Sequence, residues 1–223
     1  MILCITGTNT DVGKTIATAA LGLRLQQEGW EVVALKPLQT GEPAGQGDAN
    51  TVHTLTGLAT FEFARYPEPL APNLSARRAG MKQALLPEVA AWIRSFDGPN
   101  RVLLVEGAGG LLVRLADDWT LADLAQELDA PLIVVTSTQL GSLNSAELTV
   151  EAAQRRGLEV LGLIGGRVPI DPDLATQLNL DELGVVTQVP YLGSLPEGCL
   201  AHLREVAATL QLPEKVTSPT LVS

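Results

Sequence analysis

The chain has 223 residues, which is enough for one α/β domain with a full hydrophobic core. It contains 15 Lys and Arg against 25 Asp and Glu, and the resulting net charge of −10 disfavours a nucleic-acid or anionic-membrane partner, because such partners require clustered cations. No apolar run approaches the roughly 18 residues of a membrane span, and two cysteines make no disulfide framework, so the composition indicates a cytoplasmic protein.

The first predicted elements are a buried strand over the apolar residues 2–5 and a helix over 17–25. Between them, residues 7–15 read GTNTDVGKT, and a glycine-rich turn closed by Gly-Lys-Thr between strand and helix is typical of a phosphate-binding loop. Backbone N–H groups and the helix N-terminus would bind a polyphosphate, and we expect Lys14 and a Mg²⁺ held by Thr15 to neutralise most of its charge. Five residues separate the outer two glycines, where the standard pattern has four, and an ordinary glycine-rich turn is the alternative.

The rest of the chain alternates between predicted strands and helices. Apolar runs predict strands at 31–36, 102–105, 132–136, 160–164 and 185–189, and helical patterns cover 48–58, 87–96, 121–128, 141–155 and 197–210. Pro37 is expected to end the second strand, and the prolines of 66–72 predict an extended or turn segment. The alternation predicts one α/β domain over 1–212 with a doubly wound, mostly parallel sheet, followed by a flexible tail over 213–223.

Four residues stand at the ends of predicted strands, namely Lys36, Glu106, Thr136 and Pro190. Because ligands of doubly wound sheets bind at the carboxyl ends of the strands, we expect these residues to converge on one crevice with the phosphate loop. Each has an ordinary alternative, such as a solvated strand end for Lys36 or a plain turn after Glu106. Taken together, their placement predicts a ligand site.

Several motifs, in order along the chain, resemble those of dethiobiotin synthetases, a family with P-loop NTPase architecture. The loop 7–15 is similar to that family's phosphate loop, including its five-residue spacing, and residues 36–41 (KPLQTG) resemble its Lys-Pro-x-x-Ser/Thr-Gly. Residues 105–110 (VEGAGG) and 140–144 (LGSLN) resemble two further motifs, and 66–80 also fits. The resemblance extends to about residue 195.

The resemblance implies an ATP- and Mg²⁺-dependent closure of a ureido ring in biotin biosynthesis. In that family 7,8-diaminononanoate takes up CO₂ as a carbamate, which is phosphorylated and then attacked by the neighbouring amine, giving dethiobiotin, ADP and phosphate. The second amine is tethered to the carbamate, so closure has the high effective molarity of an intramolecular attack. Phosphoryl transfer between anions needs positive charge more than a base, which agrees with two lysines and no histidine in the motifs.

The resemblance also implies roles for individual residues. Lys14 and Lys36 would be catalytic, and Thr15, Asp48 and Glu106 would hold Mg²⁺ through the oxygen ligands that this hard cation prefers, although a loop aspartate is often only a helix cap. The nucleotide would contact Asp11, Val12, Gly13, Lys14, Thr15, Ile16, Asp48, Glu106, Gly107, Ala108, Gly109, Gly166, Arg167, Pro190, Tyr191 and Leu192.

The substrate would contact Thr10 and Thr40 and, across the interface of a homodimer that the resemblance implies, Leu143 and Asn144. The N–H groups that open the helix at 141–144 suit the substrate's distal carboxylate. Ordinary helix capping is the alternative at these positions.

The segment 165–167 (GGR) departs from the family, which often carries there an asparagine that reads the adenine base. Glycine has no side chain for that, and Arg167 cannot accept a hydrogen bond from the adenine amino group. Backbone groups at 190–192 could still contact the base. We therefore expect weak selectivity among nucleotides.

Three other readings use the same fold. A ParA- or MinD-like ATPase switch usually carries a second lysine at the start of the phosphate loop, where this chain has Thr6-Gly7-Thr8. An amide synthase of the cobyrinic-acid type needs a fused glutaminase domain, for which the chain is too short. A regulatory domain without catalytic activity is the third.

Overall fold

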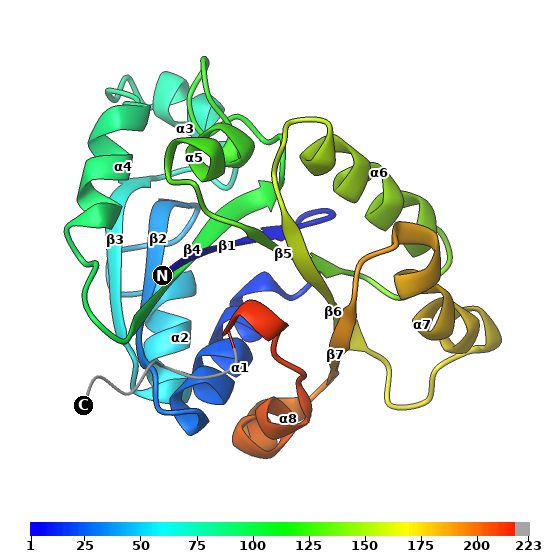
Figure 1. Ribbon diagram of the computed structural model, residues 1–223. Helices are drawn as coiled ribbons and strands as arrows, with labels where there is room; N and C mark the ends of the chain where they lie inside the picture. Colours follow the sequence, from blue (N-terminus) through cyan, green and yellow to red (C-terminus); the bar gives the residue numbers. More distant parts are fainter. Residues whose placement is uncertain (217–223) are drawn as a thin grey trace.

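The computed structural model describes residues 1–216, which form a three-layer α/β domain (Figure 1). Its central sheet has the strand order β3-β2-β4-β1-β5-β6-β7, and every pairing between these neighbours is parallel. This arrangement confirms the predicted doubly wound sheet. The strands are β1 (Ile2–Gly7), β2 (Glu31–Thr40), β3 (Ala59–Tyr66), β4 (Arg101–Gly110), β5 (Leu132–Thr136), β6 (Val160–Val168) and β7 (Tyr191–Pro196).

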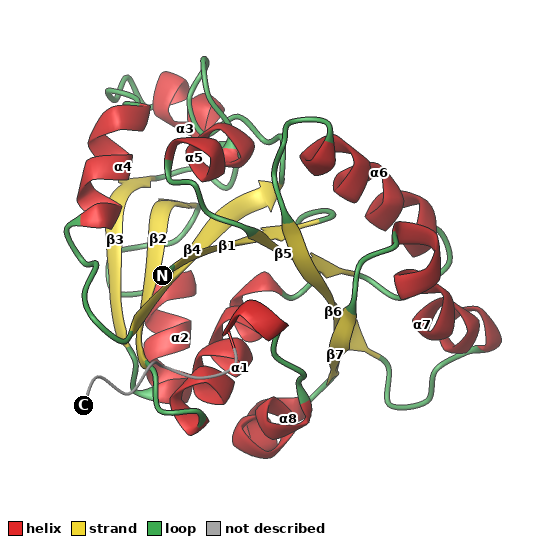
Figure 2. Ribbon diagram, in the orientation of Figure 1, coloured by secondary structure: helices red, strands yellow, loops and turns green. Residues whose placement is uncertain are grey.

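Both faces of the central strands are buried, which explains their continuous apolar runs. In β1, Leu3 and Ile5 belong to the core on one face and Cys4 to the core on the other, as the two-residue period of a strand requires. Figure 2 shows α1, α2 and α8 on one side of the sheet and α3, α4 and α5 on the other. The helices are α1 (Lys14–Gln27), α2 (Asp48–Thr56), α3 (Pro72–Arg78), α4 (Leu86–Arg94), α5 (Leu121–Glu127), α6 (Ser142–Gln154), α7 (Leu174–Thr187) and α8 (Leu203–Thr209), with short 3₁₀ helices at Cys199–His202 and Glu214–Val216.

The predicted end of β2 at Pro37 is wrong, because the strand continues to Thr40. Its pairing with β4 ends at Leu35, whereas its pairing with β3 continues, so the missing N–H of Pro37 is tolerated. The edge strand β3 itself was not predicted. It carries Glu62 and Arg65 and is only half-buried, so it lacks the apolar run that marks an inner strand.

The predicted strand at 185–189 is also wrong. Residues 185–187 form the last turn of α7, and the seventh strand is β7, which begins after Pro190. The pair Val185-Val186 has the composition of a strand, but Val185 is exposed on the helix. β7 instead contains a glycine and a serine, which weaken a strand signal.

The chain beyond Pro213 was predicted to be loosely ordered. Residues 214–216 form a 3₁₀ turn whose Val216 is buried in the core beneath α1 and α8. Lys215 forms an ion pair with Glu159, which holds this turn against the start of β6. The remainder of the predicted tail lies outside the described residues. Within residues 1–216, no helix has the length and apolar character needed to cross a membrane.

Candidate functional site

A cavity of about 1310 Å³ lies at the carboxyl ends of β1, β2, β4 and β7. β1 is paired with β4 on one side and β5 on the other, so the loop that follows it opens into the middle of this edge. The expected convergence at this edge is found for Lys36 and Glu106, which both face the cavity, but not for Thr136 and Pro190, which do not line it. Of the residues predicted to bind nucleotide, substrate or metal, those lining the cavity are Thr10, Asp11, Gly13, Lys14, Thr15, Ile16, Lys36, Thr40, Asp48, Glu106, Ala108, Gly109 and Arg167.

The loop between β1 and α1 has the backbone of a phosphate cradle. Asp11 and Gly13 both adopt left-handed conformations, with φ of 59° and 96°, which turn successive N–H groups toward one side. A Cβ on Gly7 would lie 2.7 Å from the carbonyl oxygen of Asn9, so the tight turn requires glycine there. Gly13 then stands directly before the first residue of α1, which leaves the free N–H groups of that helix facing the cavity.

Lys14 is buried at the cavity wall, and its Nζ donates to the carbonyl oxygen of Asn9 at 3.1 Å. Burial lowers the pKa of Lys14 and the nearby Lys36 ammonium lowers it further, against the opposing effect of Glu106 and Asp48. A bound polyphosphate would stabilise the charged form of Lys14, because its negative charge offsets the cost of burying the ammonium group.

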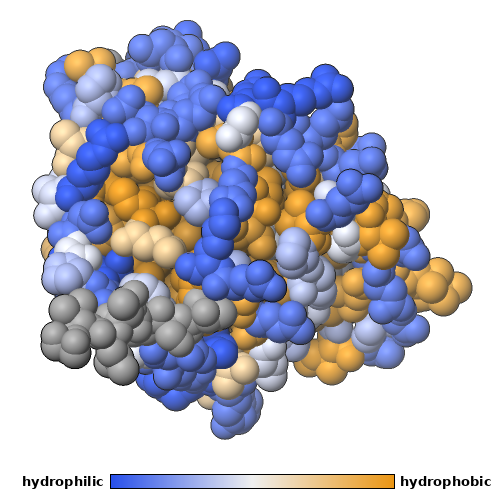
Figure 3. All heavy atoms as spheres, viewed as in Figure 1, coloured by the Kyte–Doolittle hydropathy of each residue, from blue (hydrophilic) through white to orange (hydrophobic). Residues whose placement is uncertain are grey.

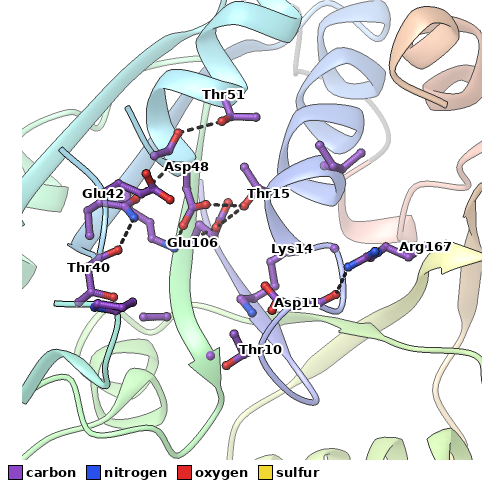
Figure 4. A pocket seen from close by; sticks show the side chains of 18 of the residues that line it. Thr10, Asp11, Lys14, Thr15, Thr40, Glu42, Asp48, Thr51, Glu106 and Arg167 are labelled. Atoms are coloured by element: carbon purple, nitrogen blue, oxygen red, sulfur yellow. Dashed lines mark hydrogen bonds and ion pairs between the residues drawn. The ribbon is translucent and has the colours of Figure 1, made fainter. Parts of the chain in front are cut away.

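A second cluster joins three elements around Lys36, near the carboxyl end of β2. Figure 4 shows Asp48 and Glu106 of this cluster beside Thr15. The Nζ of Lys36 lies 2.5 Å from Oδ2 of Asp48, at the start of α2, and 2.9 Å from Oε1 of Glu106 in β4. It also donates to the carbonyl oxygen of Gly107 at 2.8 Å. With all three ammonium hydrogens engaged, Lys36 is held at a fixed position between the two carboxylates.

Burial by itself would lower the pKa of Lys36, but the carboxylates of Glu106 and Asp48 outweigh it and raise the pKa above its usual value. Burial would likewise raise the pKa of Asp48, yet the Lys36 ammonium and its hydrogen bond outweigh burial and lower it. Burial raises the pKa of Glu106 against the opposing effect of Lys36, and the Asp48 carboxylate adds to the rise. The site therefore favours the charged form of Lys36 between the two carboxyl groups.

The oxygen atoms near Lys36 fit a small divalent cation. The hydroxyl of Thr15 lies 2.8 Å from Oδ1 of Asp48 and 3.1 Å from Oε1 of Glu106. Adjacent ligands of an octahedral Mg²⁺ are about 2.9 Å apart, as follows from its metal–oxygen distance of about 2.0–2.1 Å. No group of three or more His, Cys, Asp or Glu that could hold a metal occurs in the described part of the chain, so a magnesium ion here would use two carboxylates, one hydroxyl and ligand oxygens.

The two ends of the cavity differ in character. At the end beside β2, Thr10 and Thr40 lie with Ala108, Val113 and the segment 69–72, which offers hydroxyls next to an apolar wall. Leu143 and Asn144, at the start of α6, do not line this cavity. Leu143 packs partly against the core beneath α6 and α7, and Asn144 is exposed.

At the other end, the Nη1 of Arg167 donates to the carbonyl oxygen of Asp11 at 3.4 Å, as Figure 4 shows. Val12, Gly107 and Gly166 lie behind the cavity wall rather than in it. A Cβ on Gly166 would lie 1.9 Å from the carbonyl oxygen of Val12, so the phosphate loop rests on this glycine.

The structure does not bring Pro190, Tyr191 and Leu192 to the cavity. Because β7 begins at Tyr191, Pro190 precedes the strand, Tyr191 and Leu192 occupy its amino end, and Leu192 is buried in the core. The segment 195–200, which ends β7 and follows it, lines the cavity instead. Sequence reasoning missed this segment because it placed the last strand too early, and the rule of carboxyl ends applied to the correct strand would have found it.

The sheet order, the loop that leads into α1 and the lysine–carboxylate cluster define a P-loop nucleotide-binding protein. Solved structures with this fold include the septum site-determining protein MinD of Pyrococcus horikoshii with Mg-ADP (TM-score 0.56, 21% identity, 97% of this chain and 90% of that one). A ParA family ATPase of Chlorobium tepidum is also similar (TM-score 0.54, 17% identity, 97% and 95%). At these identities the likeness shows the fold alone.

Sequence comparison identifies the family. A family model described as an AAA domain matches residues 2–200. The ATP-dependent dethiobiotin synthetase BioD of Corynebacterium diphtheriae is 60% identical over 220 residues, covering 99% of this chain and 98% of that protein. The enzyme of the same name from Corynebacterium kroppenstedtii is 63% identical over 198 residues, covering 88% and 86%. The chain belongs to the ATP-dependent dethiobiotin synthetases, a family of ligases, which confirms the resemblance found in its motifs.

Proposed function

We propose that this protein closes the ureido ring of dethiobiotin in biotin biosynthesis, using 7,8-diaminononanoate, CO₂ and ATP. The observation that carries the proposal is the buried Lys36, held between Asp48 and Glu106 next to the phosphate loop. The names of the relatives point to the same product. A fixed cation between the phosphate loop and the end of the cavity beside β2 suits the transfer of phosphate between two anions.

In the proposed reaction, one substrate amine adds to CO₂ and loses a proton to give a carbamate. A carbamate oxygen then attacks the γ-phosphorus of ATP, and ADP leaves. The second amine attacks the carbamate carbon and loses a proton, phosphate leaves with the C–O bond electrons, and the ring closes. The amine is already tethered, so this last step has the high effective molarity of an intramolecular reaction.

The lysines serve this sequence as positioned charges. Lys14 faces the phosphate loop and would hold the transferred phosphate, while Lys36 would face the carbamate and the oxygen between carbon and phosphorus. Thr15, Asp48 and Glu106 would hold Mg²⁺, which, when bound, supplies further charge neutralisation on the phosphate oxygens. Asp11, Gly13 and Ile16 would contact the nucleotide from the loop and from α1.

Thr10 and Thr40 would hydrogen-bond the substrate at the end of the cavity beside β2, with its hydrocarbon chain against the segment 69–72. A homodimer would then supply Leu143 and Asn144 from a partner subunit. Apolar side chains exposed near and on α6 and α7 support such an interface, and hydrophobic surface is visible over α7 (Figure 3). They include Leu140 at 88%, Leu174 at 70% and Val185 at 66% exposure.

We also propose a cytoplasmic enzyme with small-molecule substrates and no nucleic-acid partner. Both cysteines are free and buried, which is typical of a reducing compartment. The net charge of −10 provides no general attraction for a phosphate backbone.

The proposal is tested by measuring ADP release with and without 7,8-diaminononanoate, in the presence of bicarbonate and Mg²⁺. We expect release to depend on the diamine and to equal the dethiobiotin formed, as measured by mass spectrometry. Hydrolysis of ATP at the same rate without the diamine, and no dethiobiotin, would instead support an ATPase switch of the ParA or MinD kind.

A further inference from the structure

The loop that joins β2 to α2, residues 41–47, delivers Asp48 to the site, and the side chains of Gln39, Thr51 and Arg65 hydrogen-bond to this loop or to Asp48 directly after it. We propose that one of them, Arg65 of the edge strand β3, is a positioning residue for the metal site. In this role Arg65 fixes the loop so that the Asp48 carboxylate faces Thr15 and Lys36. The inference rests on the proposed Mg²⁺ site and extends it to a residue that does not touch the cavity.

The side chain of Arg65 hydrogen-bonds to the backbone of the loop. Its Nη1 donates to the carbonyl oxygens of Glu42 at 2.7 Å and Pro43 at 2.8 Å, and its Nη2 donates to that of Gln46 at 2.7 Å. The guanidinium is itself oriented by a two-oxygen contact with Glu62, at 2.7 and 2.6 Å. A planar guanidinium can bind three carbonyls and a carboxylate together, whereas an ammonium has only three hydrogens to donate.

Gln39 holds the same loop from the inside. It pairs with Arg65 across the β2–β3 ladder, and its buried side chain accepts a hydrogen bond from the backbone N–H of Asp48 at 2.9 Å. The residue before Asp48 is Gly47, which has no side chain to cap α2. A Cβ there would lie 2.7 Å from Cδ of Gln39, so glycine is required for Gln39 to act as the cap.

These contacts converge on one carboxylate. Asp48 is the first residue of α2, directly after the held loop, and its two oxygens are shared between Thr15 and Lys36. The loop contains no helix or strand. Without Arg65, three of its carbonyls would lose this partner, and the side-chain hold on the backbone next to Asp48 would rest on Gln39 and Thr51.

Electrostatics and positioning predict opposite results when Arg65 is replaced by an uncharged residue. Removing a positive charge near a cation site can only strengthen cation binding, because it removes repulsion. Loss of a correctly placed carboxylate weakens cation binding. A fall in metal affinity is therefore specific to positioning.

The experiment measures Mn²⁺ binding by electron paramagnetic resonance in the presence of saturating ADP, for wild type, Arg65→Met, Gln39→Leu and Asp48→Asn. We expect the dissociation constant of Mn²⁺ to rise about tenfold in Arg65→Met, equivalent to about 1.4 kcal/mol, with a similar rise in Gln39→Leu. Binding of ADP without metal should stay within about twofold of wild type, and hydrogen exchange should rise in residues 41–47.

Arg24→Met is the matched control. Arg24 has a side-chain exposure of 21% against 22% for Arg65, pairs with a glutamate four residues away and donates to one carbonyl, but it lies at the far end of α1. Its Mn²⁺ affinity should equal that of wild type. Unchanged affinity in Arg65→Met, or an equal loss in Arg24→Met, would overturn the positioning role. If Asp48→Asn binds Mn²⁺ as wild type does, the proposed metal site itself is wrong.

Discussion

Replacing Gly166 with alanine tests whether the phosphate loop depends on the strand beside it. A Cβ at residue 166 would lie 1.9 Å from the carbonyl oxygen of Val12 and 3.2 Å from Cγ1 of Val135. Real Cβ atoms essentially never approach another atom closer than 3.0 Å, so the contact must open by 3.0 − 1.9 = 1.1 Å. Either β6 or the phosphate loop has to move by that amount.

The loop has little freedom to move without losing its shape. The side chain of Val12 is buried in the core, and the residues on either side, Asp11 and Gly13, are both in left-handed conformations. Misplacing a binding group by about 1 Å costs about 10²-fold in activity, and overpacking costs about 1–3 kcal/mol of stability. We expect Gly166→Ala to bind ADP about 10²-fold more weakly and to unfold at a lower temperature.

Isothermal titration with Mg-ADP and thermal unfolding measure these two effects. Gly184→Ala is the control, because a Cβ on Gly184, which lies within α7, would meet its nearest atom at an ordinary 3.5 Å. This control should bind nucleotide normally and be no less stable, since alanine favours helix. The reasoning fails if Gly166→Ala binds ADP within twofold of wild type with an unchanged melting temperature.

Four further predictions concern the proposed reaction. Lys36→Ala should lose about 10²–10³ in turnover, as expected for one lost transition-state contact, while still binding nucleotide; near wild-type turnover refutes its catalytic role. Asp48→Asn should need more Mg²⁺ for half-maximal rate, and an unchanged dependence on Mg²⁺ would mean that Asp48 has only a structural role at the start of α2. The values of kcat/KM for ATP, CTP and GTP should lie within about 100-fold of one another, because residues 165–166 lack the side chain for a bidentate base contact, which would give about 1–3 kcal/mol of discrimination. Mixing Lys36→Ala with an Asn144→Ala chain should restore roughly one functional site per mixed dimer, and no recovery in proven mixed dimers would place the site within one chain.

The inner part of the fold could be predicted from the sequence because burial on both faces leaves a plain signal. The run Leu132–Thr136 matches β5 in both bounds, and the helix expected after Gly141 is α6. The edges gave weaker signals. β3 mixes Phe61 and Phe63 with charged residues, and β7 contains a glycine with a φ of 136°, so neither shows the apolar run of an inner strand.

The same division applies to the site. Lys14 follows the inner strand β1, Lys36 and Glu106 lie in the carboxyl halves of the inner strands β2 and β4, and the structure brings all three to one cavity. The contacts of Arg65 and Gln39 depend on the unpredicted edge strand β3, so no pattern along the chain could indicate them. Likewise, Leu195 and Glu197 reach the cavity only because β7 begins later than its apolar residues suggested.

The structure explains why residues 165 and 166 are both glycine, which the sequence alone did not. A Cβ on Gly165 would lie 2.1 Å from the hydroxyl of Tyr191, and one on Gly166 would strike Val12 in the phosphate loop. An asparagine at Gly166 therefore could not read a base while the loop keeps its present position. Of the described residues near this end of the cavity, Arg167 and the segment 195–200 remain to contact a base. A preference for ATP above about 100-fold would accordingly have to come from one of these two, since contacts to the triphosphate are the same for every nucleotide.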